Sequence, residues 1–125
     1  MEKNCIDELI EKLTYDDRHE QNWHGYVGAA YVRDDGSISI MRSWADPSAG
    51  TNEERLILRP GKKGKGVRVT GFNDRGDDID FTSPADWSMK DLVERMLKAD
   101  GKSIEALVDA IRGKQVYEGV IYYSF

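Results

Sequence analysis

Six basic side chains and no acidic one lie between positions 55 and 68 of an otherwise acidic chain. They are Arg55, Arg59, Lys62, Lys63, Lys65 and Arg68. The chain has a net charge of −5, so the remainder carries −11 once these six positive charges are set aside. Guanidinium and ammonium groups bind phosphate and carboxylate oxygens through charge-assisted hydrogen bonds. A cationic segment on an anionic protein also concentrates such anions locally. We therefore interpret positions 55–68 as a binding site for an anionic ligand or for an acidic partner surface.

Glycines at positions 61, 64 and 66 separate the three lysines. A glycine–lysine loop offers ammonium groups together with unobstructed backbone N–H groups, which suits phosphate oxygens. It is not a Walker loop, because Lys65 precedes a predicted strand and that motif requires a helix after its lysine. The alternative is a solvated hairpin tip whose lysines discourage pairing between sheet edges.

Trp44 is the one aromatic residue that we assign to the same candidate site. It follows Arg42 near the end of a predicted strand. A tryptophan beside arginines can stack on a base or another planar ring. Packing in the core is the alternative for this side chain.

Both histidines, His19 and His24, lie in one polar segment that also contains Asp16 and Asp17. A spacing of five residues places two side chains about 140° apart on a helix. The segment therefore does not match the H-E-x-x-H zinc motif, whose histidines share one helix face. We expect a polar loop here, and a small hydrolase that uses this cluster remains a third interpretation.

No other motif indicates catalysis or a cofactor. The acidic segment 73–80 has four aspartates but lacks the EF-hand pattern, and its residue types are those of an ordinary turn. Cys5 is the only cysteine, lies on an apolar helix face and excludes an internal disulfide, which favours a reducing compartment. We expect no cofactor, no metal and no enzymatic activity.

The length of 125 residues predicts a single domain over residues 1–125, large enough to bury a core. No apolar run approaches the roughly 20 residues needed to span a bilayer. The N-terminus lacks the pattern of a signal peptide. These features predict a cytoplasmic protein that does not bind membranes.

Hydrophobic periodicity predicts an α+β fold with a mostly antiparallel sheet of about six strands. A helix begins after Asn4, with apolar residues at 5, 6, 9, 10 and 13. A turn at 34–36 joins two strands, a polar loop covers 45–52, and a capping box at Ser88 and Asp91 opens the first of two later helices. The predicted strands are 26–33, 37–44, 55–59, 67–72, 79–82 and 115–125; the predicted helices are 5–13, 88–97 and 103–111.

The final segment, 115–125, is rich in aromatic residues. A bare apolar edge strand invites aggregation, so this strand is expected either inside the sheet or at a subunit contact. The interior position is the first expectation, and a homodimer or higher homo-oligomer remains open.

These observations leave two main interpretations. The first is a non-enzymatic protein that captures an anionic, phosphate-bearing, nucleotide-like ligand through the basic hairpin. The alternative is a small acidic protein–protein inhibitor of the phage anti-defence or toxin-immunity type, with an acidic or basic protein as its partner.

Overall fold

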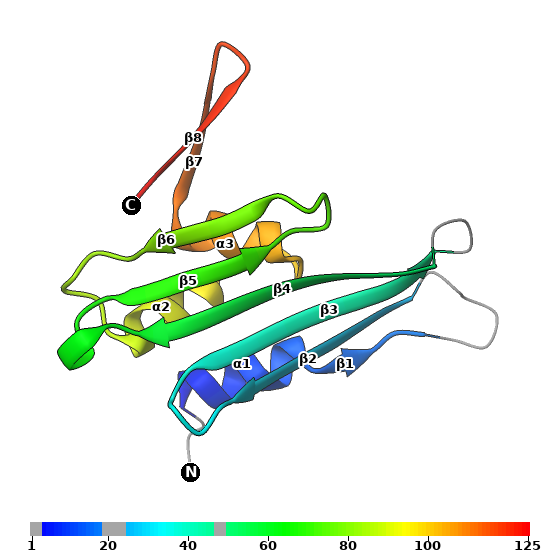
Figure 1. The fold of residues 1–125 in the computed structure, drawn as a ribbon, viewed down its shortest axis with the longest axis horizontal. Coiled ribbons are helices and arrows are strands. Elements are labelled where there is room, and N and C mark those ends of the chain that lie inside the picture. Colours follow the sequence, from blue (N-terminus) through cyan, green and yellow to red (C-terminus); the bar gives the residue numbers. More distant parts are fainter. Residues whose placement is uncertain (1–3, 19–24, 47–49) are drawn as a thin grey trace.

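The computed structural model describes residues 4–18, 25–46 and 50–125. Six antiparallel strands form one sheet, β1 to β6, in chain order, and three helices cover one of its faces (Figure 1). This arrangement confirms the predicted α+β class. The elements are α1 (Cys5–Leu13), β1 (Tyr15–Asp16), β2 (Tyr26–Val32), β3 (Ile38–Asp46), β4 (Gly50–Pro60), η1 (Lys62–Gly64), β5 (Val67–Phe72), β6 (Asp78–Thr82), α2 (Met89–Met96), α3 (Ile104–Ile111), β7 (Gly113–Tyr117) and β8 (Val120–Ser124).

The hairpin between β2 and β3 forms where the sequence predicts it. Gly36 takes a φ of 84°, which glycine adopts without steric cost. The Asp35 carboxylate accepts hydrogen bonds from the backbone N–H and the hydroxyl of Ser37. These local bonds close the turn and fix the register that pairs Val32 with Ile38.

Each helix begins at a side-chain cap. Asn4 accepts a hydrogen bond from the Asp7 N–H at the start of α1, and Ser103 does the same for Ala106 at the start of α3. Ser88 and Asp91 form the predicted capping box at the start of α2. These caps satisfy backbone donors that a helix leaves free in its first turn.

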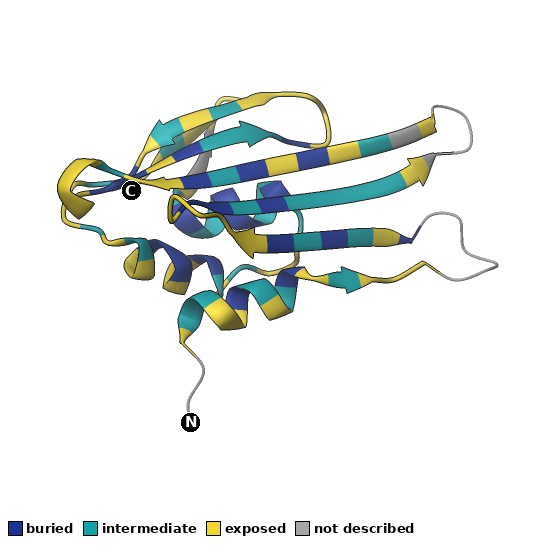
Figure 2. Cartoon of the chain, turned by 60° about the horizontal axis from the view of Figure 1, so that its bottom comes forward, coloured by how far each residue is buried: buried dark blue, intermediate teal, exposed yellow. Residues whose placement is uncertain are grey.

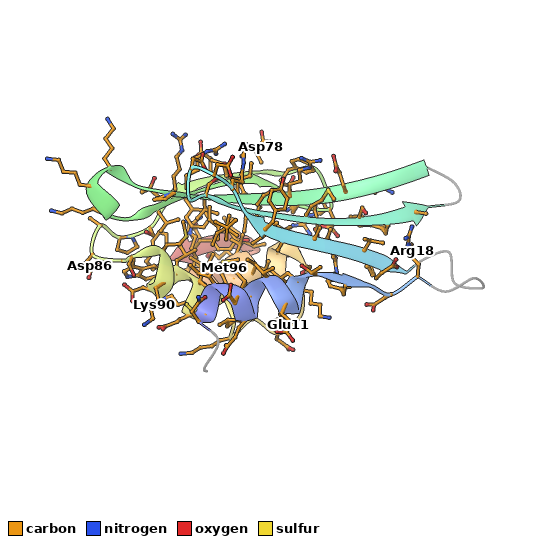
Figure 3. The ribbon with its side chains drawn as sticks, turned by 90° about the horizontal axis from the view of Figure 1, so that it is seen from below. Glu11, Arg18, Asp78, Asp86, Lys90 and Met96 are labelled. Atoms are coloured by element: carbon orange, nitrogen blue, oxygen red, sulfur yellow. The ribbon has the colours of Figure 1, made fainter. Side chains whose placement is uncertain are left out.

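The hydrophobic core lies between the helices and the inner face of the sheet (Figure 2). Leu56 and Leu58 of β4 are fully buried against the helices, so Ile57 between them lies on the outer face. The helices contribute Leu9, Leu92, Met96, Ile104 and Leu107, all fully buried. No helix covers the outer face, as the side view shows (Figure 3).

Two strands are longer than the sequence predicts. The expected loop at 45–52 is wrong at both ends, because β3 and β4 continue their pairing from Trp44–Asn52 to Asp46–Gly50; residues 47–49 lie outside the described residues. Polar residues disfavour strands only weakly when a partner strand is present. The β3–β4 pair therefore extends beyond the helices (Figure 1).

The sixth strand of the sheet is β1, which the sequence did not reveal because it has only two residues. Tyr15 pairs with Gly28 of β2. A Cβ added at Gly28 would collide with the Tyr15 ring and lie 2.5 Å from the Leu13 carbonyl oxygen. Only a glycine at this position permits the close approach of β1 to β2.

The expectation of a single interior strand over 115–125 is wrong. The segment folds back at Glu118 and Gly119, both with positive φ, into the separate hairpin β7–β8. This hairpin leaves the body beside β6 and does not join the main sheet (Figure 1). Gly119 indicated a turn at this position, but the apolar residues on both sides of it suggested one continuous strand.

No helix within the described ranges is both long and apolar enough to cross a membrane.

Candidate functional site

The predicted basic residues lie on β4, β5 and the loop between them, at one end of the sheet. Arg55 and Arg59 share the outer face with Ile57, because Leu56 and Leu58 point into the core. The register pairs Arg59 directly with Arg68 of β5, so all three arginines lie on this one face. The register therefore brings Arg68 next to Arg59, while Arg55 lies four residues further along β4, opposite Phe72.

The loop is closed by backbone hydrogen bonds. The Gly61 N–H donates to the Gly66 carbonyl at 2.9 Å, and the Gly66 N–H donates to the Trp87 carbonyl at 3.0 Å. Lys63 has a φ of 58°, which is uncommon for a residue with a Cβ. A defined backbone thus carries three exposed ammonium groups at the end of the sheet, next to the segment that opens α2.

Ion pairing divides the six basic residues into two groups. Arg55 pairs with Glu53 at 3.2 Å, and Arg68 pairs with Asp80 at 3.2 Å. Arg59 instead donates from Nη1 to the Thr70 hydroxyl at 3.0 Å. These bonds neutralise two arginines locally and leave the charge of Arg59 uncompensated.

We call the second group the cationic tip: Arg59, Lys62, Lys63 and Lys65. Within residues 4–18, 25–46 and 50–125, none of these four side chains has an ion pair with a carboxylate. Asp86 lies at the same end of the molecule, below the tip (Figure 3). The three lysine side chains are exposed, so the tip offers charge to a ligand that approaches from solvent.

Trp44 does not lie near the cationic tip. It pairs with Asn52 at the far end of β4, about 26 Å along the strand from Pro60 at roughly 3.3 Å per residue. Its side chain lies on the inner face, 5.6 Å from the Tyr26 ring between centroids. The Arg42 guanidinium stacks on Tyr26 at 4.1 Å and lies 5.8 Å from the Trp44 ring. The structure therefore separates Trp44 from the cationic tip and places it on the opposite face of the sheet from Arg55 and Arg68.

A buried ion pair that the sequence reading missed lies beside Trp44. Arg42 Nε donates to Glu54 Oε1 at 2.7 Å, with side-chain exposures of 15% and 1%. Glu54 Oε1 also accepts the backbone N–H of Ile104 at 3.1 Å, at the start of α3. The alternation of side chains along the strands could have indicated this pair. Arg42 lies two residues from Ile40 and Glu54 two residues from Leu56, so both charged side chains lie on the face of the buried apolar residues. The pair joins the sheet to a helix and its role is structural.

Tyr15 belongs to the same cluster. The Arg42 side chain acts on its hydroxyl, and Lys102 lies over its ring at 4.2 Å. Burial raises the pKa of this hydroxyl above the ordinary 10.0, while the guanidinium of Arg42 opposes the increase. Tyr15 therefore stays protonated at neutral pH.

The two histidines fall outside the described residues. Of their acidic neighbours, Asp16 pairs with Arg18 at 2.8 Å and so is engaged locally. Across the described ranges, no group of three or more histidine, cysteine or acidic side chains is placed to hold a metal ion.

The acidic segment 73–80 forms a turn over 73–77 and then the start of β6. The Asn73 carboxamide oxygen accepts the N–H groups of Arg75 and Asp77, both at 3.0 Å. Arg75 then pairs with Asp77 and with Glu105 of α3, each at 3.2 Å. The turn lies at the opposite end of β5 from the cationic tip, as a meander requires (Figure 1).

The cationic tip can bind and orient an anion by charge and by N–H donation. Comparison with known proteins adds no further assignment. No protein-family model, no curated protein and no solved structure matches this chain.

Proposed function

We propose that this chain is a non-enzymatic binding protein whose cationic tip captures a phosphate-bearing, nucleotide-like anion. The observation that carries the proposal is the division of the basic residues. Arg55 and Arg68 are ion-paired, whereas Arg59 donates only to a hydroxyl and the three lysines of the loop have no carboxylate pair within the described ranges. Four like charges held close together repel one another, and an anion relieves that repulsion.

The chemistry of the tip favours phosphate groups. Lysine ammonium groups bind phosphate as point charges, and arginine adds directional N–H donors. The lysines are exposed, so the ligand is contacted from one side. A chain of phosphates meets more of these cations than a single phosphate does, which favours a nucleoside triphosphate over inorganic phosphate.

We propose binding as the activity because the four side chains of the cationic tip supply positive charge and hydrogen-bond donors to an anion. Trp44 lies too far from the tip to stack on the base of the same ligand. We therefore expect the phosphates to supply most of the affinity and the base to supply little.

The test is isothermal titration calorimetry with a nucleoside triphosphate and with inorganic triphosphate. We expect binding of both, weakened when NaCl is raised from about 50 to about 200 mM, because salt screens exposed charges. Lys63→Glu should weaken binding by at least tenfold, because it removes one charged hydrogen bond and places a negative charge in the tip. Combined Lys62→Glu, Lys63→Glu and Lys65→Glu should remove it.

Lys98→Glu is the matched control for Lys63→Glu, because it makes the same change in charge at an exposed position after α2. It should leave the affinity close to that of the wild type. Failure of both triphosphates to bind, or equal losses in Lys98→Glu and Lys63→Glu, would contradict the proposal.

The second candidate function is protein–protein inhibition of the anti-defence or immunity type. It is favoured by the outer face of the sheet, where the register places the half-buried Met41, Ile57 and Phe72. All three helices of the described ranges lie on the other face (Figure 3). Apolar side chains flanked by charged ones are typical of protein interfaces. A partner captured by wild type, lost in Ile57→Lys and retained in the triple lysine variant would select this function.

A further inference from the structure

The β7–β8 hairpin concentrates exposed apolar side chains in a part of the molecule with little else around it (Figure 1). Tyr117 is 67% exposed and Tyr122 is 54% exposed. Val120, Ile121 and Phe125 are also about half exposed. Soluble monomers rarely expose so many large apolar residues together, and such a patch usually marks a site of interaction.

The hairpin is attached at its base. Phe125 packs against the rings of Phe81 and Trp87, at centroid distances of 5.6 and 5.5 Å. Tyr123 is half-buried and lies 4.8 Å from the Arg112 guanidinium. These contacts fix where the hairpin leaves the body and use one of its two faces.

The opposite face has no such contacts. The register pairs Tyr117 with Val120, so both lie on one face, and Tyr122 follows two residues later on the same side. Ile121 and Tyr123 lie on the side that faces β6 and α3, where they line one groove with Phe81 and Val108. Tyr117, Val120 and Tyr122 thus form an outward apolar face, which we call the aromatic face.

The outer edge of β8 is also open. β7 is its only strand partner within the described residues. An isolated two-stranded hairpin is marginally stable in water, and a third or fourth strand is normally needed. Residues 119–125 contain no charged side chain, so no side-chain repulsion opposes pairing along this edge.

We propose that β8 pairs with β8 of a second copy of this chain, antiparallel, around a two-fold axis at Tyr122. The pairing produces a four-stranded sheet, β7–β8–β8–β7, across the dimer. A second copy fits because an antiparallel contact of one strand with itself is self-complementary, and a two-fold dimer requires this property. In this register Tyr122 lies opposite Tyr122, and Val120 lies opposite Ser124.

The contact joins two strand edges and is therefore small. At this edge Tyr122 lies beside Tyr122 of the second copy and Val120 beside Ser124, whereas Ile121 and Tyr123 face the body and take no part. Such a contact buries less than the roughly 1,200 Å² of a standard interface. We expect a dimer that dissociates on dilution.

Salt distinguishes this contact from the cationic tip. Each copy carries a net charge of −5, so the two bodies repel one another at low ionic strength. Salt screens that repulsion and leaves apolar burial intact. Raising NaCl should therefore strengthen the dimer and weaken triphosphate binding, so either proposal can fail while the other stands.

The first test is sedimentation velocity of the full chain over a range of concentrations. We expect a shift from monomer to dimer as concentration rises. Tyr122→Lys places two like charges opposite each other at the axis and should give a monomer at all concentrations. Tyr31→Lys is the control, since Tyr31 is 56% exposed on the outer face of β2, and it should retain the dimer. A wild-type monomer throughout, or an equal loss in both variants, would overturn the proposal.

The second test fixes the register and does not depend on a disruptive substitution. In a Cys5→Ala background, Tyr122→Cys should form a disulfide between copies, because paired Cα atoms in antiparallel strands lie about 4.5–5.5 Å apart. Val120→Cys should not, because the two copies of that residue would lie about 13 Å apart along the strands. Equal cross-linking of both variants, or of neither, would contradict the two-fold contact.

Discussion

Removal of the Glu54 carboxylate tests whether the buried Arg42–Glu54 pair holds the sheet to α3. In Glu54→Ala, Arg42 loses a partner at 2.7 Å, and the Ile104 N–H at the start of α3 loses its acceptor. Breaking a buried ion pair from one side costs about 3–5 kcal/mol, because the remaining charge is left without compensation. Arg42 keeps a stacking contact with Tyr26 at 4.1 Å and slight access to solvent, so we expect about 4 kcal/mol.

The assay is urea unfolding followed by circular dichroism. With a slope of about 2 kcal/mol per molar urea, the loss lowers the midpoint by about 2 M. Glu54→Gln keeps the shape and an acceptor for Ile104, so it should lose about half as much. Replacing the pair by Arg42→Met with Glu54→Leu should cost less than Glu54→Ala alone, since no unpaired charge is left.

Glu53→Ala is the matched control one residue away. Its partner is Arg55 at 3.2 Å, and both side chains are about half exposed. Exposed pairs contribute about 1 kcal/mol or less. If Glu54→Ala costs no more than Glu53→Ala, the assignment of a buried pair that joins β4 to α3 is refuted.

Two further predictions concern Tyr15 and Gly71. Because burial raises the folded-state pKa of Tyr15 above 10.0, its contribution to stability is complete below pH 10 and declines as the pH rises through the folded-state pKa. In Tyr15→Phe the melting temperature should therefore fall less steeply with pH above about pH 10 than in the wild type. An unchanged slope would contradict the burial of this hydroxyl. At Gly71 an added Cβ would collide with the Arg55 carbonyl oxygen and lie 3.0 Å from the Leu56 Cα, so Gly71→Ala should cost about 2 kcal/mol or more in urea unfolding. Gly76→Ala meets nothing within 4 Å and should cost about 1 kcal/mol through its φ of 79° alone; equal losses at the two sites would exclude the steric argument.

The parts of the fold that depend on local chemistry were readable from the sequence. The turn at Gly36, the Ser88–Asp91 capping box and the helix start at Ser103 each use hydrogen bonds within four residues of chain. The alternation of Arg55 and Arg59 with Leu56 and Leu58 in the sequence matches their outer position in the sheet, because alternate residues of a strand share a face. Local geometry alone determined these features.

The parts that depend on distant partners were not readable. Arg68 joins Arg59 only because of the β4–β5 register, and Glu54 is buried only because Arg42 and the start of α3 meet it. The separation of Trp44 from the lysine loop depends on the full length of β4, which residue types at its start did not indicate. The turn at Gly119 was missed because apolar residues on both sides continued the pattern of a single strand.

Phosphate binding by the cationic tip can be located by titrating inorganic triphosphate into the ¹⁵N-labelled chain and mapping the amide shifts. We expect saturable shifts at Gly61, Lys63, Gly64 and Gly66, lost in the triple lysine variant and unchanged in Lys98→Glu. Shifts centred elsewhere, or no saturable shift at millimolar ligand, would contradict it.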